Sequence, residues 1–285
     1  MNRTGKGESH GAATIVNAIA TGKGAAFGID LKTWAEVNVL DSPKVEVSIE
    51  GFSREPTRLV ENCFRAVIDK MMPGERPGAK IVTRSQIPVS RGLKSSSAAA
   101  NAVIMATLDA LGEKMEPLEA IRLGTKCAID AGVSVTGAFD DACAAWLGGA
   151  VVTDNRNDEL LRREPMDPNL KVVIHVPPFQ TRKSGLPRSR ISAISDVAEM
   201  AFQMALKGDY LGAMKLNGLC YASALSVDQE VAFRALELGA RSAGLSGTGP
   251  ATAILVDSEK LEKFLSDIKS TKEFIITDIF NGANA

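Results

Sequence analysis

The sequence predicts an α+β protein with two packed domains that divide near residue 150. Strand-like segments precede helix-like segments in the first half, whereas strands and helices alternate in pairs in the second half. The 285 residues also exceed the roughly 100–200 residues of one ordinary domain. No long linker separates the halves, so we expect them to pack together, the second as a four-stranded ferredoxin-like sandwich.

Short apolar or alternating segments predict strands in the first fifty residues, where Gly, Asp and Pro punctuate them. These strands cover 25–29, 34–40 and 45–49. A helix over 55–72 follows, because apolar residues recur every four positions from Leu59 to Met71. A strand over 79–83 then leads into three more helices, at 98–111, at 117–131 and from Asp140 to about 147.

The second half alternates predicted strands and helices. The strands cover 150–153, 172–176, 251–256 and 274–278. The helices cover 191–206, 210–225, 229–242 and 259–270. This order of elements is the reason for expecting a ferredoxin-like sandwich.

Composition excludes several classes of protein. Lys and Arg number 33 against 34 Asp and Glu, and aromatic residues make up 5%, which argues against a protein that wraps nucleic acid or coats an anionic membrane. No apolar run reaches the ~18–20 residues of a membrane helix. The four cysteines lie far apart without a C-x-x-C pair, which favours reduced thiols in a cytoplasmic protein over a zinc site or a disulfide framework.

The most unusual segment is 88–100. It reads Pro88, Val89, Ser90, Arg91, Gly92, Leu93, Lys94, Ser95, Ser96, Ser97, Ala98 and continues as an alanine-rich helix. Glycine lets a backbone approach a ligand closely, and a helix N-terminus presents unpaired N–H donors to di- or triphosphate. An ordinary serine-capped helix is the alternative, but three serines exceed what a cap requires. The segment predicts a phosphate loop, although neither the P-loop nor the Rossmann pattern is present.

Residues 88–100 resemble the Pro-x-x-x-Gly-Leu-x-Ser-Ser-Ala signature of the GHMP kinases (galacto-, homoserine, mevalonate and phosphomevalonate kinases). Residues 245–251 are similar to the third, glycine-rich motif of these kinases, while 17–29 and 136–142 resemble their archaeal-type shikimate kinase branch. The resemblance covers nearly the whole chain. It implies the GHMP kinase fold, with a ribosomal-S5-domain-2-like α/β domain over 1–150 and a ferredoxin-like domain over 151–285.

The resemblance also implies an activity. It is the ATP- and Mg²⁺-dependent phosphorylation of the 3-hydroxyl of shikimate, in chorismate and aromatic amino acid biosynthesis, by a monomer or homodimer that needs neither nucleic acid nor membrane. Homoserine and mevalonate kinases are rivals, but they usually carry Gly-Glu-His in the first motif, where this alignment places Val16-Asn17. A non-catalytic ligand sensor on the same fold is a further alternative, against which the retention of Ser96 and Asp140 argues.

Asp140 is the candidate general base that the resemblance implies, because 136–140 match the family's Ser-Gly-x-x-Asp pattern. An aspartate at a helix N-terminus is expected to stay ionised, and its alternative role is a helix cap. Ser96 aligns with the family's Mg²⁺-binding serine. The Glu of many relatives, eleven or twelve residues before the base, is replaced here by Ile129 or Ala128, so that Asp130 becomes the second candidate metal ligand, or else a solvated helix-end acid.

Four more residues are candidates for substrate binding. Lys23 belongs to the first motif, and Gly247 and Thr248 belong to the third. The fourth is Arg182, with Arg188 of the same basic cluster, 181–190, as its alternative, and either could bind the carboxylate of shikimate in a bidentate manner. Lys94 replaces a glycine that many relatives have, and it either pairs with a phosphate or projects into solvent.

Overall fold

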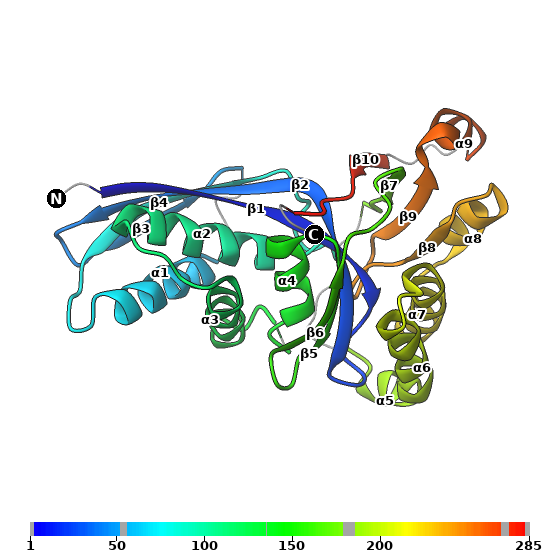
Figure 1. The fold of residues 1–285 in the computed structure, drawn as a ribbon, viewed down its shortest axis with the longest axis horizontal. Coiled ribbons are helices and arrows are strands. Elements are labelled where there is room, and N and C mark those ends of the chain that lie inside the picture. The colour runs from blue at the N-terminus through cyan, green and yellow to red at the C-terminus, as the bar shows by residue number, and fades with distance from the viewer. Residues whose placement is uncertain (1–2, 52–55, 135, 179–185, 269–273, 283–285) are drawn as a thin grey trace.

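The computed structural model describes residues 3–51, 56–134, 136–178, 186–268 and 274–282. Two β-sheets form its frame, and helices pack against both of them (Figure 1). The first sheet and its helices come mainly from the first half of the chain, and the second sheet comes from the second half. In the described part of the chain, no helix is long and apolar enough to cross a membrane.

The first sheet has six strands in the order β3-β4-β2-β5-β6, with β1 also paired to β2. Its strands are β1 (Arg3–Val16), β2 (Lys23–Leu40), β3 (Val45–Ile49), β4 (Gly78–Ser85), β5 (Ala150–Asp154) and β6 (Glu159–Glu164). Only β3 and β4 run parallel among these pairs. Strand β2 pairs with β5 through its first residues and with β4 through its last, so it joins the two parts of the sheet.

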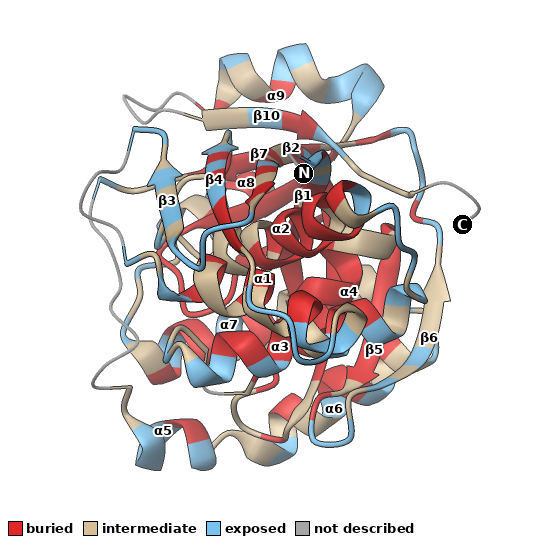
Figure 2. Cartoon of the chain, turned by 90° about the vertical axis from the view of Figure 1, so that its left-hand side faces the viewer, coloured by how far each residue is buried: buried red, intermediate tan, exposed pale blue. Residues whose placement is uncertain are grey.

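Four helices cover one face of this sheet: α1 (Arg58–Met71), α2 (Ser95–Leu111), α3 (Pro117–Asp130) and α4 (Phe139–Leu147). Helix α2 is central and buried along most of its length (Figure 2). Its alanines allow a close approach to β1, where a Cβ added to Gly5 would lie 2.1 Å from the Ala110 nitrogen. The glycines of β1 and the alanines of α2 therefore bring the C-terminal half of the helix close to the sheet.

The second sheet is antiparallel and has the order β10-β7-β9-β8. Its strands are β7 (Leu170–His175), β8 (Ser242–Leu245), β9 (Thr252–Asp257) and β10 (Phe274–Asp278). The helices of this half are α5 (Arg188–Ser192), α6 (Ser195–Leu206), α7 (Tyr210–Leu225), α8 (Glu230–Glu237) and α9 (Leu261–Asp267), the last preceded by a 3₁₀ turn, η1 (Ser258–Lys260). This strand order is the ferredoxin-like order predicted from the sequence.

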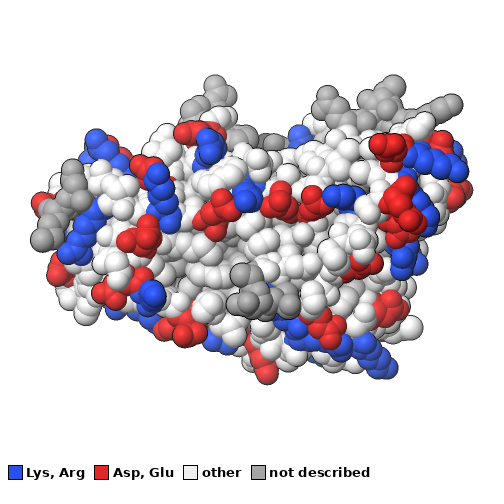
Figure 3. All heavy atoms as spheres, turned by 45° about the horizontal axis from the view of Figure 1, so that its top comes forward, with Lys and Arg blue, Asp and Glu red and all other residues white. Residues whose placement is uncertain are grey.

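The two halves share one hydrophobic core. Phe27 of β2, Val172 of β7 and Phe202 of α6 belong to the same buried cluster, and Ile29 forms a β-bridge with Ile279. On the face shown in Figure 3, acidic and basic side chains alternate without a large area of one sign. The division at residue 150 stays a prediction, although hydrogen bonding continues the first sheet as far as Glu164.

The elements differ from prediction in five places. The segments 25–29 and 34–40 form the single strand β2, and β1 begins at Arg3, well before the first predicted strand at 25–29. The predicted helix 191–206 is divided between α5 and α6. Strands β6 and β8 were not predicted, and the predicted helix 229–242 overlaps β8 only at Ser242. Both are short strands, and in β6 charged residues dominate, so neither has the apolar alternation that predicts a strand.

Candidate active site

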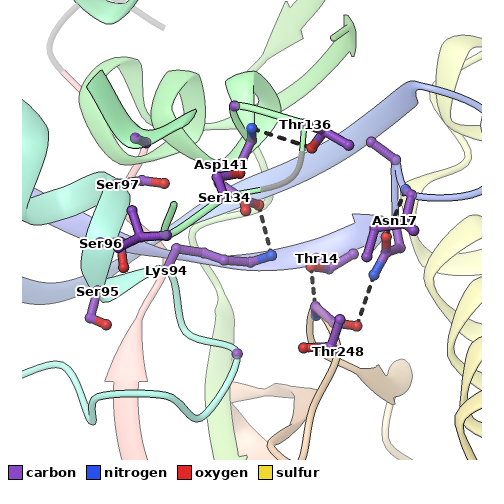
Figure 4. Close-up of a pocket in the computed structure, with 18 of the residues that line it drawn as sticks. Thr14, Asn17, Lys94, Ser95, Ser96, Ser97, Ser134, Thr136, Asp141 and Thr248 are labelled. Atoms are coloured by element: carbon purple, nitrogen blue, oxygen red, sulfur yellow. Dashed lines mark hydrogen bonds and ion pairs between the residues drawn. The ribbon is translucent and has the colours of Figure 1, made fainter. Parts of the chain in front are cut away.

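A cavity of about 510 Å³ lies where the phosphate loop, the start of α4 and the turn at 246–249 meet the end of β1 (Figure 4). Its lining includes most of the predicted loop and three other predicted residues: Val89, Ser90, Gly92, Lys94, Ser95, Ser96, Ser97, Asp140, Gly247 and Thr248. This volume falls within the roughly 300–1,000 Å³ of small-molecule sites. The structure thus brings together motifs that lie 150 residues apart in the chain.

The serines of the loop are not helix caps. Helix α2 begins at Ser95, and the capping position is Lys94, in the left-handed region with φ 66° and without a side-chain hydrogen bond to the helix. The first turn of α2 is therefore Ser95, Ser96 and Ser97, on the wall of the cavity. N–H groups at such a position carry the positive end of the helix dipole and suit a phosphate. The alternative of a serine-capped helix is wrong.

The loop is held by the glycine-rich turn. The Ser246 hydroxyl donates to the Gly92 carbonyl at 2.7 Å, and the Ala251 N–H donates to the Arg91 carbonyl at 3.1 Å. Gly92 has φ 88°, and a Cβ there would lie 2.1 Å from the Ser246 carbonyl oxygen, so only glycine fits. The Arg91 guanidinium donates to the Pro177 carbonyl at 2.6 Å and ties the loop to the end of β7.

Not every loop residue lines the cavity. Leu93 and Ala98 are buried in the core beneath the loop. Pro88 and Arg91 are likewise outside the cavity lining, and Arg91 contacts the segment after β7 instead. These four residues support the loop rather than face a ligand.

The end of β1 supports the same turn. The Gly247 N–H donates to the Thr14 hydroxyl at 2.8 Å, and the Asn17 side-chain amide donates to the Gly247 carbonyl at 2.9 Å (Figure 4). Both Thr14 and Asn17 line the cavity, and neither was predicted as a site residue. The available signal was Asn17 itself, a polar residue that interrupts an apolar stretch.

Two buried carboxylates stand at the start of α4. Asp140 is 4% exposed and Asp141 is 7% exposed. The capping residue of α4 is Ala138, so Asp140 lies inside the first turn and is not the helix cap. The Asn155 amide donates to Oδ1 of Asp140 at 2.7 Å, and the Thr153 hydroxyl holds the oxygen of that amide at 2.6 Å. This arrangement orients Asp140, and Asn155 was not predicted because it follows β5, far from the motif in sequence.

Burial, followed by the neighbouring Asp141 carboxylate, raises the pKa of Asp140 to about 7, although Lys94 and Asn155 oppose the shift. Burial thus shifts this pKa upward, opposite to the lowering that a helix N-terminus alone would cause. A carboxyl group that titrates near neutral pH is suited to accept a proton from a substrate.

Several predicted residues lie elsewhere. Asp130 is exposed at the end of α3 and lines a separate hollow with Lys70 and Lys126, so the structure does not bring it to the cavity. Lys23 is outside the cavity lining and pairs with Glu199 at 3.1 Å. Arg182 lies outside the described residues.

Oxygen donors suited to Mg²⁺ do gather in the cavity. Ser96, Asp140 and Asp141, whose side chains carry oxygen, all line it, and Asp130 does not. Mg²⁺ prefers oxygen and needs few protein ligands, because water and substrate phosphates complete its shell. Among the described residues, no three His, Cys, Asp or Glu side chains form a cluster that could hold a metal without such help. The donor set fits a magnesium ion that arrives with a nucleotide.

Comparisons with known proteins agree with this geometry. Residues 58–149 match the model of the GHMP kinases N terminal domain. The chain is 48% identical over 267 residues to the shikimate kinase of Methanosarcina acetivorans, a match that covers 93% of this chain and 90% of the relative. It is 45% identical over 285 residues to the shikimate kinase of Methanococcoides burtonii, covering 99% and 98% of the two chains.

Solved structures show the same fold at low identity. A homoserine kinase from Cytophaga hutchinsonii superposes with a TM-score of 0.75 at 17% identity, covering 99% of this chain and 96% of the other. A Lactococcus lactis galactokinase complexed with galactose gives a TM-score of 0.78 at 14% identity, covering 98% and 94%. At these identities the likeness concerns the fold alone.

Proposed function

The chain belongs to the shikimate kinase family of the GHMP kinases, and from this premise we propose that it transfers the γ-phosphoryl group of ATP to the 3-hydroxyl of shikimate. The observation that carries the proposal is one cavity that holds both an uncapped helix N-terminus and a buried, oriented carboxylate, Asp140. The first suits a phosphate chain, and the second suits a hydroxyl proton.

The phosphate loop binds the nucleotide in this proposal. The first turn of α2, from Ser95 to Ser97, offers backbone N–H groups and hydroxyls to the phosphates. Gly92 and Gly247 lack side chains at the point where the loop meets the glycine-rich turn, which lets the two backbone segments of the site pack closely together. Phosphoryl transfer depends chiefly on such positioning and on charge neutralisation.

Asp140 acts as the general base. Its ionised carboxylate accepts the proton of the attacking hydroxyl as the new O–P bond forms and the bond to the ADP leaving group breaks. Asn155 holds Oδ1 of Asp140, and Oδ2 lies beside Gly24 of β2. The carboxylate is thus fixed before the substrate arrives, as efficient proton transfer requires.

Ser96 and Asp141 would hold the magnesium ion, with Asp141 in the role that we expected for Asp130. When bound, Mg²⁺ neutralises phosphate charge and orients the phosphate chain. Thr248 lines the cavity and remains a candidate for substrate binding. The partner of the shikimate carboxylate remains Arg182, whereas Lys23 would reach the cavity only after leaving Glu199. A cytoplasmic monomer or homodimer remains our expectation.

A coupled assay of ADP release tests this function, with shikimate, homoserine and mevalonate side by side. Turnover with shikimate alone is the expected result. Turnover with homoserine or mevalonate instead would reassign the substrate within the same fold. ATP binding without turnover of any of the three would favour a ligand sensor.

A further inference from the structure

Lys94 adopts a backbone conformation that a lysine does not favour. Its φ of 66° and ψ of 32° place it in the left-handed region, where a Cβ is crowded and glycine is not. The following residues could form α2 equally well after a glycine. A lysine here therefore needs a reason in its side chain.

That side chain points into the cavity and not into solvent (Figure 4). It is 10% exposed, and its ammonium lies 2.8 Å from Oδ1 of Asp141, whose side chain is also 10% exposed. The alternative that Lys94 projects into solvent is wrong. The ammonium is a buried cation beside the two carboxylates of the site.

The ammonium also stands at the phosphate end of the cavity. A Cβ added to Gly247 would lie 3.2 Å from Nζ of Lys94, so the ammonium reaches from the start of α2 to the glycine-rich turn. Its charge acts on Asp140 too, where it opposes the rise of the pKa caused by burial. Lys94 thus lies beside both Asp140 and Asp141 and next to the expected position of the phosphates.

The ion pair with Asp141 cannot persist unchanged when a nucleotide binds in the proposed way. Asp141 is the best-placed carboxylate for Mg²⁺, and a metal ion and an ammonium compete for the same oxygen. A phosphate chain offers the ammonium another partner, and the flexible four-carbon stem of lysine allows a move over a short distance.

We propose that Lys94 neutralises Asp141 in the free enzyme and moves to the phosphate chain of the nucleotide when Asp141 binds the magnesium ion. The proposal rests on the proposed function, since it needs a phosphate chain at the start of α2. One consequence is that Lys94 keeps the metal from binding before the nucleotide. Another is that its charge stabilises the phosphoryl group during transfer.

The test measures Mn²⁺ binding to the nucleotide-free full chain by electron paramagnetic resonance, together with kcat for shikimate. Lys94→Gly removes the competing charge, and glycine accepts the left-handed backbone. We expect it to bind Mn²⁺ at least about tenfold more tightly than the wild type, because the Asp141 carboxylate no longer pairs with a nearby positive charge. Its kcat should fall about 10²–10³-fold, as for the loss of one preorganised charge. Lys94→Arg should keep the weak Mn²⁺ binding.

Lys260→Ala is the matched control, because it breaks a lysine–aspartate pair of 2.7 Å with Asp257 outside the cavity. It should change neither the Mn²⁺ affinity nor kcat. Unchanged Mn²⁺ affinity in Lys94→Gly, or a kcat within about threefold of the wild type, overturns the proposal. Lys94→Asn, which also tolerates the left-handed region, gives the same two readouts if the glycine variant unfolds. If the wild type does not phosphorylate shikimate, the proposed function fails, and the Mn²⁺ measurement still decides the exchange at Asp141.

Discussion

Gly24 of β2 leaves the space that Asp140 occupies: a Cβ at position 24 would lie 2.5 Å from Oδ2 of Asp140 and 2.8 Å from its Cγ. Asp140 is held on its other side by the Asn155 amide at 2.7 Å. The carboxylate is thus enclosed between a strand without a side chain and a hydrogen-bond donor. Its position depends on both.

Gly24→Ala should displace the Asp140 carboxylate, since the added methyl group and the carboxyl oxygen cannot occupy the same place. General-base catalysis contributes about 10²–10⁴-fold, so we expect kcat to fall about 10²-fold or more. Steady-state kinetics with shikimate and ATP measure it. Gly124→Ala is the control, because its Cβ would come closest to the flexible end of the Ile104 side chain, at 3.1 Å. A nearly normal kcat in Gly24→Ala would show that Asp140 can move without loss of activity.

Asp140→Asn removes the proton acceptor and keeps the shape of the side chain. Ala138 caps α4, so the change leaves the helix cap intact. We expect kcat to fall about 10²–10⁴-fold while KM for shikimate is roughly kept, because the carboxylate acts mainly in the transition state. Asp154→Asn, at the end of β5 outside the cavity lining, should behave as the wild type. Retention of full activity in Asp140→Asn would exclude Asp140 as the base.

Ser96→Ala should weaken the use of Mg·ATP and leave α2 intact, since alanine is a better helix former than serine. We expect the Mg²⁺ concentration for half-maximal rate to rise about tenfold with the loss of one oxygen ligand. Titration of the initial rate with Mg²⁺ measures this. Ser195→Ala alters the first residue of α6, away from the cavity, and should have no effect. The same Mg²⁺ dependence in both variants would contradict the role of Ser96.

The sequence was informative where local pattern decides structure. Helix α7 and strands β3 and β10 have the predicted bounds, and the strand order of the second sheet is ferredoxin-like as expected. The Gly-Leu-Lys-Ser-Ser-Ser segment, followed by alanines, predicted a ligand loop from glycine freedom and helix-end chemistry alone. The family resemblance then gave the activity class.

Tertiary contact decided what the sequence did not reveal. Asn155 meets Asp140 only because β5 and α4 pack together, and no spacing rule joins them. Asp130 seemed the nearest acid by counting residues, yet α3 carries it to another face, and Asp141 lies in the cavity. The pKa of Asp140 depends on burial, which the helix position alone does not indicate.

The raised pKa of Asp140 has a consequence for stability. Its pKa is about 7 in the folded protein against an ordinary 3.8, so between these values the folded chain holds a proton that the unfolded chain releases. The free energy of unfolding therefore falls as pH rises through this interval. At about 1.4 kcal/mol per pKa unit, the ionised carboxylate lowers the free energy of unfolding by at most about 4 kcal/mol above pH 7. Relaxation of the site reduces this figure.

Asp140→Asn should therefore melt at a higher temperature than the wild type near pH 8, where Asp140 is ionised, and the difference should shrink toward about pH 4, where both side chains are neutral. Thermal unfolding without metal or nucleotide, followed across this range, measures the difference. A difference that is constant with pH, or a lower melting temperature near pH 8, would contradict a raised pKa. A more stable but inactive Asp140→Asn would mean that the fold tolerates this carboxylate because the phosphoryl transfer requires it.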